Sequence, residues 1–187
     1  MPPTNRAPSS PFVSDLAEIR SRARAHIEQG AVTQSNTKDL ATTMKLLNEA
    51  LATEIVCTLR YKRHYYTARG IHKESVAEEF AAHAEEEQEH ADLIAERITQ
   101  LGGSPNFNPE GLTSRSSSEY NEPSDLLEMI KENLIAERIA IETYSAMVRF
   151  FGSEDPTSRR LIETILAVEE EHANDMADLL AAHDRGA

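Results

Sequence analysis

The sequence predicts an all-α protein: a four-helix bundle of two antiparallel helix hairpins joined by one long crossover. Long stretches rich in Ala, Glu and Leu favour helix, and the 187 residues include only 7 glycines and 8 prolines. Four stretches carry apolar residues at steps of three and four, which is typical of helices with one buried face. Two of the connections between these stretches are short and one is long, which is typical of a single-crossover bundle.

The N-terminal region differs from the rest of the chain. Residues 1–13 are polar and rich in Pro and Ser, so we expect them to be disordered. Ser14 can cap a short helix that runs to about Gly30. We therefore predict a partly disordered arm with a short helix over residues 1–35 and the helical bundle over residues 36–187.

The boundaries of the four long helices follow from capping residues and glycines. Ser124-Asp125 can cap the third helix, and Asp155-Pro156 begins the fourth with a proline at the first helical position. Glycines follow the first three helices, as is common at helix ends. The long helices are expected at about 36–69, 73–101, 124–152 and 155–183.

The lengths of the connections set the topology. The first and third are only a few residues long, so the helices that they join form antiparallel hairpins. The middle connection, residues 102–123, has 22 residues, whereas neighbouring antiparallel helices need about 2–8. Fully extended it spans roughly 70 Å, more than the roughly 42 Å of a helix of about 28 residues. It is therefore long enough to recross the bundle.

Composition excludes several classes of site and partner. Cys57 is the only cysteine, so an intrachain disulfide and cysteine-built zinc or iron–sulfur sites are excluded. We interpret it as a buried structural thiol. The net charge of −13 argues against nucleic acid as the main ligand. No stretch has the length of a membrane span and no signal peptide is visible, so we expect a cytoplasmic location and no membrane partner.

Each predicted long helix carries a glutamate in the middle of its apolar seam, and two of them add a histidine three residues later. Buried carboxylates without partners cost several kcal/mol each and repel one another. Four carboxylates and two neutral imidazoles instead suit two divalent cations, because four negative charges then meet four positive charges. Such oxygen and nitrogen ligands suit iron or manganese, and zinc can also bind. The six residues are Glu54, Glu87, His90, Glu137, Glu169 and His172.

The placement of these residues is more specific than the Glu-x-x-His spacing alone. In each hairpin, the glutamate of the first helix precedes the histidine of the second by 36 or 35 residues. A tyrosine, Tyr61 or Tyr144, follows that first glutamate by seven residues. The chain therefore consists of two similar hairpins, each expected to contribute half of one site. We interpret His83 as a hydrogen-bonded seam histidine, with a secondary metal contact as the alternative, and Glu86 as part of a solvated face.

Several segments resemble the ferritin-like superfamily, and bacterioferritins most closely, over about residues 39–182. The segments are Leu47–Glu54, Glu87–Asp92, Glu96–Ile98, Leu101–Pro105 and Glu169–His172. The resemblance implies a ferritin-like bundle with a dinuclear centre inside one subunit.

The resemblance also assigns roles to the six residues by position. Glu87 and Glu169 would bridge the two metals, while Glu54 and Glu137 would be terminal carboxylates. His90 and His172 would be terminal imidazoles. Tyr61 would lie beside the centre and supply a hydrogen bond or an electron, and Tyr144 would mirror it.

The function that this resemblance implies is that of an iron-storing ferroxidase. The enzyme would bind two iron ions per subunit and oxidise Fe²⁺ to Fe³⁺ with peroxide or dioxygen. It would store the product as mineral in a homo-oligomeric cage, which protects against oxidative stress. Manganese or zinc are further metals that the isolated protein would accept.

Two features differ from bacterioferritins. Those proteins bind haem through a methionine directly after the bridging glutamate of the second helix, and here that residue is Gln88; we therefore expect no haem. They also carry a fifth helix that helps to build a 24-subunit cage, whereas only 15 residues follow His172 here. We therefore expect a dodecamer of the Dps kind (DNA-binding protein from starved cells), with a 24-mer as the alternative. Many Dps-like proteins with a bacterioferritin-type site carry a cysteine pair near it, and this chain has only Cys57.

Other functions are kept as alternatives. One is a non-storing di-iron or di-manganese enzyme that consumes peroxide, similar to rubrerythrin or manganese catalase. Another is a DNA-compacting shell with a degenerate site. We do not expect DNA binding, because the arm to Gly30 has four arginines, no lysine and three acidic residues.

Overall fold

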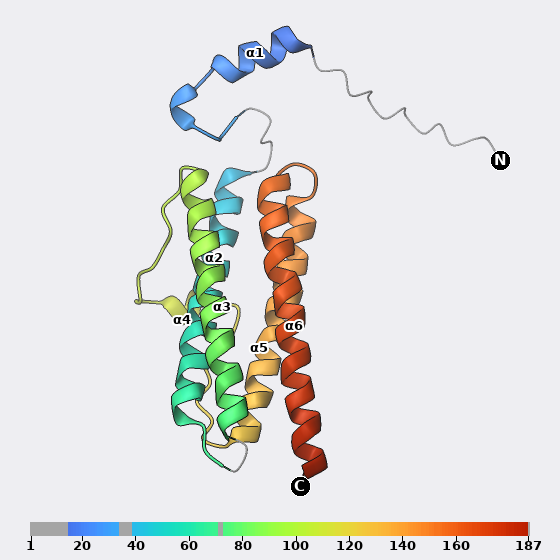
Figure 1. The fold of residues 1–187 in the computed structure, drawn as a ribbon. Helices are drawn as coiled ribbons and strands as arrows, with labels where there is room; N and C mark the ends of the chain where they lie inside the picture. The colour runs from blue at the N-terminus through green and yellow to red at the C-terminus, as the bar shows by residue number, and fades with distance from the viewer. Residues whose placement is uncertain (1–14, 34–38, 71–72, 187) are drawn as a thin grey trace, which may run out of the picture.

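Two pairs of long antiparallel helices form the structure (Figure 1). The computed structural model describes residues 15–33, 39–70 and 73–186, without the side chains of residues 73 and 183–186. Helix α2 packs along α3 and α5 along α6, while α3 contacts α6 and α2 contacts α5. This arrangement confirms the predicted fold class. In the described residues the helices are α1 Leu16–Arg24, α2 Leu40–Thr67, α3 Lys73–Gln100, α4 Leu112–Arg115, α5 Leu126–Phe151 and α6 Pro156–Gly186, with a 3₁₀ turn at Ile27–Gln29.

Aspartates begin three of the long helices. The Asp39 carboxylate accepts a hydrogen bond from the backbone N–H of Ala41 at 3.0 Å and so caps α2. Asp125 caps α5 and Asp155 caps α6 in the same way. None of the helices in the described ranges has the length and apolarity needed to cross a membrane.

The N-terminal helix is shorter than predicted. Helix α1 ends at Arg24, and His26 then adopts a positive φ of 53° before the 3₁₀ turn. None of the α1 residues is buried, and Figure 1 shows the helix beyond the end of the bundle. A helix of this length without tertiary packing is only marginally stable. The predicted disorder of residues 1–13, the Ser14 cap and the boundary between residues 35 and 36 lie outside the described residues.

Hydrogen bonds connect the crossover, residues 102–123, to α2 along its length. The backbone N–H of Asn106 donates to Asn48 Oδ1 at 2.8 Å, and that of Ser117 donates to Thr53 Oγ1 at 2.9 Å. Further along, Arg60 Nη1 donates to a crossover carbonyl at 3.2 Å. The short helix α4, which the sequence did not predict, lies on this segment (Figure 1). The crossover therefore covers α2 as it returns to the start of α5.

Two apolar clusters form the core, one on each side of a polar layer. Along each long helix, the predicted ligand residues lie between members of the two clusters. The first cluster includes Leu47, Leu51, Ile94, Ile98, Tyr144, Phe151, Ile162 and Ile165. The second includes Tyr61, Val76, Phe80, Ala84, Met129, Ile130 and Met176. Packing above and below the polar layer therefore holds the four helices in register.

A buried ion pair connects the two hairpins at the start of α6, and its removal should destabilise the fold. Arg97 Nη2 donates to Asp155 Oδ1 at 3.0 Å, and the same oxygen accepts from the Ser158 N–H at 3.0 Å. Asp155→Ala leaves Arg97 buried without its partner and removes the helix cap. We expect a loss of about 3 kcal/mol or more, measured by denaturant unfolding. Asp178→Ala, an exposed site on α6, is the control; a loss below about 1 kcal/mol at position 155 would contradict the assignment.

Candidate metal centre

The six predicted ligand residues lie together in the polar layer between the two apolar clusters. Their relative exposures run from 0 % to 6 %, so all of them are buried. One glutamate comes from each long helix, and the two histidines come from α3 and α6. The seam pattern places each carboxylate on the inward face of its helix, which is why four separate segments bring these residues to one point.

The ligand atoms form two overlapping groups. The first joins Glu54, Glu87, His90 and Glu169; the second joins Glu87, Glu137, Glu169 and His172. Within each group the possible ligand atoms all lie within 4.8 Å of one another. Glu87 and Glu169 belong to both groups. The arrangement therefore has the geometry of two adjacent cation sites that share two carboxylates.

Distances within the layer show how closely its nitrogen and oxygen atoms approach. His90 Nδ1 lies 3.0 Å from Glu169 Oε1 and 3.4 Å from Glu54 Oε2. His172 Nδ1 lies 3.5 Å from Glu169 Oε2 and 3.7 Å from Glu87 Oε1. Each histidine thus faces carboxylates from more than one helix, with Glu169 between them.

The same atoms lack hydrogen-bond partners, which tests whether the residues fit metal ions. Buried polar atoms are almost always satisfied in folded proteins. In the described residues, seven of the twelve buried side-chain atoms without a partner lie in this layer. These seven are carboxylate oxygens and imidazole nitrogens, the donor types that bind divalent cations. The set fits two such ions. The atoms are Glu54 Oε2, Glu87 Oε1, His90 Nδ1, Glu137 Oε2, both oxygens of Glu169 and His172 Nδ1.

Protons balance the charge of the centre when metal is absent. Burial, together with the charge of Glu169, raises the pKa of Glu87 well above its usual range, and burial with Glu87 does the same for Glu137. Burial alone would lower the pKa of His90, but contacts with Glu169 and Glu54 raise it to about 10. Glu169 and Glu87 likewise outweigh burial and raise the pKa of His172 to about 12.

Glu54 and Glu137, which each belong to only one of the two groups, accept a hydrogen bond from a tyrosine of the opposite hairpin. Tyr61 Oη donates to Glu137 Oε1 at 2.5 Å, and Tyr144 Oη donates to Glu54 Oε1. Both phenols are fully buried. Burial and the adjacent carboxylates raise the pKa of both tyrosines, so the phenols are protonated and act as donors. The two tyrosines therefore orient the carboxylates in a symmetric way.

Sequence reasoning missed one contact at the rim. The sequence predicts that Glu86 lies on a solvated face, and its side chain is 50 % exposed. Its Oε2 nevertheless lies 2.6 Å from His172 Nε2, the ring nitrogen that points away from the centre. A carboxylate in this position fixes the orientation of a metal-binding histidine. The helical pattern does not reveal this contact, because the approach of α6 brings His172 to Glu86.

Arg60 was also missed, since arginine is seldom fully buried. Its side chain is 1 % exposed and Nη2 lies 4.0 Å from Glu137 Oε1. Its Nε donates to Asn133 Oδ1 at 3.0 Å, and its Nη2 lies 3.5 Å from the sulfur of Cys57, which is buried as expected. A permanent positive charge therefore lies beside the Glu137 carboxylate.

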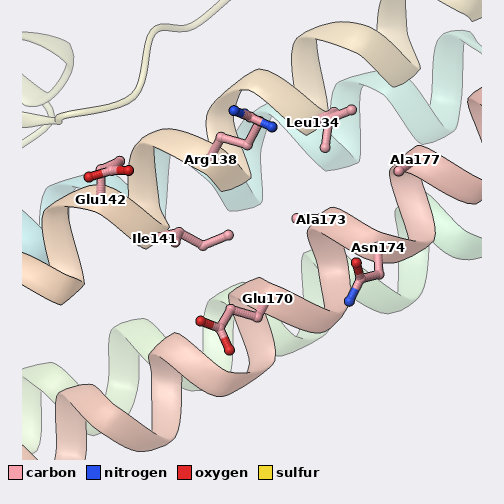
Figure 2. A pocket seen from close by; sticks show the side chains of 8 residues that line it. All are labelled: Leu134, Arg138, Ile141, Glu142, Glu170, Ala173, Asn174 and Ala177. Carbon is pink, nitrogen blue, oxygen red and sulfur yellow. The ribbon is translucent and has the colours of Figure 1, made fainter.

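A groove on the outer face of α5 and α6 is lined by none of the six predicted ligand residues. Its volume is about 570 Å³. Figure 2 shows Arg138 and Glu170, which directly follow Glu137 and Glu169 in sequence, on this outer side. Adjacent helical residues point about 100° apart, so the groove and the buried centre lie on different sides of the same helices.

The protonated histidines predict how the stability of the metal-free protein depends on pH. In the folded state His90 and His172 hold protons up to about pH 10 and 12, whereas the unfolded chain releases them near 6.5. Their stabilising contribution is complete below pH 6.5 and is lost as pH rises, by up to about 1.4 kcal/mol per pH unit for each proton. Chelator-treated protein should therefore melt at lower temperature at pH 9 than at pH 7. A double variant, His90→Gln with His172→Gln, should show a flatter dependence; an equal slope in both proteins would contradict the assignment.

Comparison with known proteins agrees with the fold. The sequence model of the family described as "Ferritin-like domain" matches residues 44–185. A nutrient stress-induced DNA-binding protein from Synechococcus sp. is 31% identical over 140 residues, which cover 72% of this chain and 78% of the relative. A bacterioferritin from Mycobacterium leprae is 27% identical over 139 residues, 74% of this chain and 83% of that protein.

One solved structure is similar to this protein in both sequence and fold. It is a dodecameric thioferritin, the bacterioferritin-related protein from Bacteroides fragilis. It superposes with a TM-score of 0.77 at 33% identity, covering 79% of this chain and 89% of the other. On the family match, these relatives and this superposition, the chain belongs to the ferritin-like family.

Proposed function

We propose that this protein is a ferroxidase that oxidises Fe²⁺ to Fe³⁺ with peroxide or dioxygen at a centre inside one subunit. The observation that carries the proposal is the pair of overlapping four-residue groups that share Glu87 and Glu169. The similarity to a bacterioferritin and to a bacterioferritin-related thioferritin supports iron as the metal.

Each residue has a proposed role in holding the ferrous substrate. Glu54 and His90 bind one ion, and Glu137 and His172 bind the other. Glu87 and Glu169 bridge the two ions and set the distance between them. The apolar clusters on both sides exclude water and keep the six side chains in place.

The electrons and protons of the reaction balance at this site. Each of two Fe²⁺ ions loses one electron. One peroxide molecule takes both electrons and two protons, its O–O bond breaks, and two water molecules form. The ions displace the protons that the histidines and the raised-pKa glutamates hold in the metal-free protein. Those protons are thus released where the oxidant consumes protons. Tyr61, which donates to Glu137, is proposed as a hydrogen-bond or electron donor beside the site.

We also propose that the product is stored as mineral inside a homo-oligomeric cage. A dodecamer is favoured because the superposed Bacteroides fragilis protein is described as dodecameric. Large apolar side chains are exposed on the hairpin of α2 and α3, namely Leu59, Tyr66 and Leu93 at 48 %, 74 % and 43 %, and contacts between copies would cover such residues. The Synechococcus relative is named as a DNA-binding protein, but the net charge of −13 here does not support that partner.

Removing both shared carboxylates tests the site. Glu87→Ala with Glu169→Ala should reduce the rate of Fe²⁺ oxidation by more than about 100-fold. The helices should stay folded, although the metal-free variant loses the contacts of Glu169 and Glu87 that stabilise the protonated histidines. The matched control is Glu85→Ala with Glu170→Ala, which removes two exposed acids from the same helices. Equal oxidation rates in the two double variants would refute the assignment.

The number of iron atoms bound per protein particle tests the proposal that the protein stores iron. After loading with Fe²⁺ and peroxide, the particle is isolated by size exclusion and its iron and protein are measured. Many irons per chain on a large particle are expected. A plateau at about two irons per chain, whatever the iron supplied, would favour the alternative of a non-storing di-iron or di-manganese enzyme that consumes peroxide.

A further inference from the structure

Three side chains form a second cluster beside the proposed centre. His83 Nε2 lies 3.2 Å from Glu79 Oε1 and 3.5 Å from Asp175 Oδ2. The possible ligand atoms of the three lie within 4.8 Å of one another. The side chain of His83 is 3 % exposed, whereas those of Glu79 and Asp175 are 40 % and 50 % exposed. The cluster thus joins a buried nitrogen to carboxylates that ions in solution can reach.

The hydrogen bonds of His83 show which of its nitrogens carries the proton. Tyr61 has one hydroxyl proton and donates it to Glu137 Oε1. His83 Nδ1 lies 3.2 Å from the same hydroxyl oxygen, so Nδ1 must be the donor in that contact. The neutral ring then has an unprotonated Nε2. This buried lone pair faces two carboxylates that offer only lone pairs, and a cation between them would satisfy all three groups.

The cluster has no counterpart in the other half of the bundle. The two hairpins match with an offset of 82 residues between α3 and α6, as in Glu87 with Glu169 and His90 with His172. The residues that match Glu79, His83 and Asp175 are Leu161, Ile165 and Leu93, all apolar. If the cluster were only a consequence of the similarity between the two hairpins, a matching polar cluster would lie in the other half of the bundle.

The cluster also adjoins the proposed centre directly. The rings of His83 and His172 stack with centroids 3.9 Å apart. His83, His172 and Glu86 form a further group of atoms within 4.8 Å. Possible ligand side chains therefore continue without interruption from the exposed carboxylates to the proposed dinuclear centre.

We propose that Glu79, His83 and Asp175 form a third divalent-cation site that binds first-row transition metal ions such as Fe²⁺ and Zn²⁺. Two carboxylates and one imidazole are a ligand set for such ions. Water can complete the coordination because the site opens to solvent on one side. The inference rests on the proposed function only in naming Fe²⁺ as the natural ion. The site itself is defined by three residues that do not belong to the dinuclear centre.

Zn²⁺, which is not oxidised, is the probe for this site. The full-length protein is freed of metal with chelator, saturated with Zn²⁺ and crystallised, and the ions are located by anomalous diffraction. Bound Zn²⁺ is counted in solution by equilibrium dialysis. The test variant is Glu79→Gln with Asp175→Asn, both at partly or fully exposed positions. The matched control is Glu78→Gln with Asp178→Asn, which removes the same charge from exposed positions on the same helices.

The expected result is a Zn²⁺ ion between His83 Nε2 and the two carboxylates in the wild type and in the control. The test variant should bind one ion fewer per chain and keep those at the dinuclear centre. No ion at this position in the saturated wild type would overturn the proposal, and so would an ion there in the test variant. If the ion is present here but absent between Glu87 and Glu169, the third site stands and the proposed ferroxidase centre fails.

Discussion

Four carboxylates buried in the middle of an apolar bundle are the constraint on which the rest of this structure depends. Each long helix supplies one of them, so the layer exists only when all four helices are in register. A slip of one helix by a single turn would move its glutamate by about 5.4 Å, farther than the 4.8 Å that encloses each ligand group. The apolar clusters above and below the layer oppose such a slip. Packing therefore determines the geometry of the centre, and two of the packed residues, Tyr61 and Tyr144, also donate hydrogen bonds to Glu137 and Glu54.

The negative charge of the four buried carboxylates also has to be compensated. In the metal-free protein, protons on the histidines and on Glu87 and Glu137 supply part of the compensating charge. Arg60 adds a charge that does not depend on pH and lies 4.0 Å from Glu137. With this compensating charge the metal-free protein can stay folded, and binding of cations would release the protons. Such exchange links the stability of the fold to the chemistry proposed for the site, because the same groups serve both.

The sequence predicts the bundle and the gathering of the six ligand residues because both follow from helical periodicity. Each seam places its glutamate inward, and Glu-x-x-His places two side chains on one helix face. Helical periodicity does not predict which side chains of different helices contact one another. The 2.6 Å approach of Glu86 to His172 depends on how α3 and α6 pack. The burial of Arg60 depends on the crossover, whose backbone accepts one of its hydrogen bonds. The end of α1 at Arg24 was missed because nothing in the local sequence shows that the helix lacks a surface to pack on.

The near-symmetry of the two hairpins makes their differences informative. The ligands and the tyrosines repeat in both halves, so the repeat accounts for the dinuclear centre. The cluster around His83 does not repeat, and apolar residues stand at the matching positions, including Ile165 within the first apolar cluster. His172 stacks on His83, the buried member of that cluster. Cations are strongly disfavoured in an apolar core and favoured beside carboxylates. The two similar halves therefore offer cations different surroundings beside the proposed centre, carboxylates next to His83 in one half and apolar side chains at the matching positions of the other.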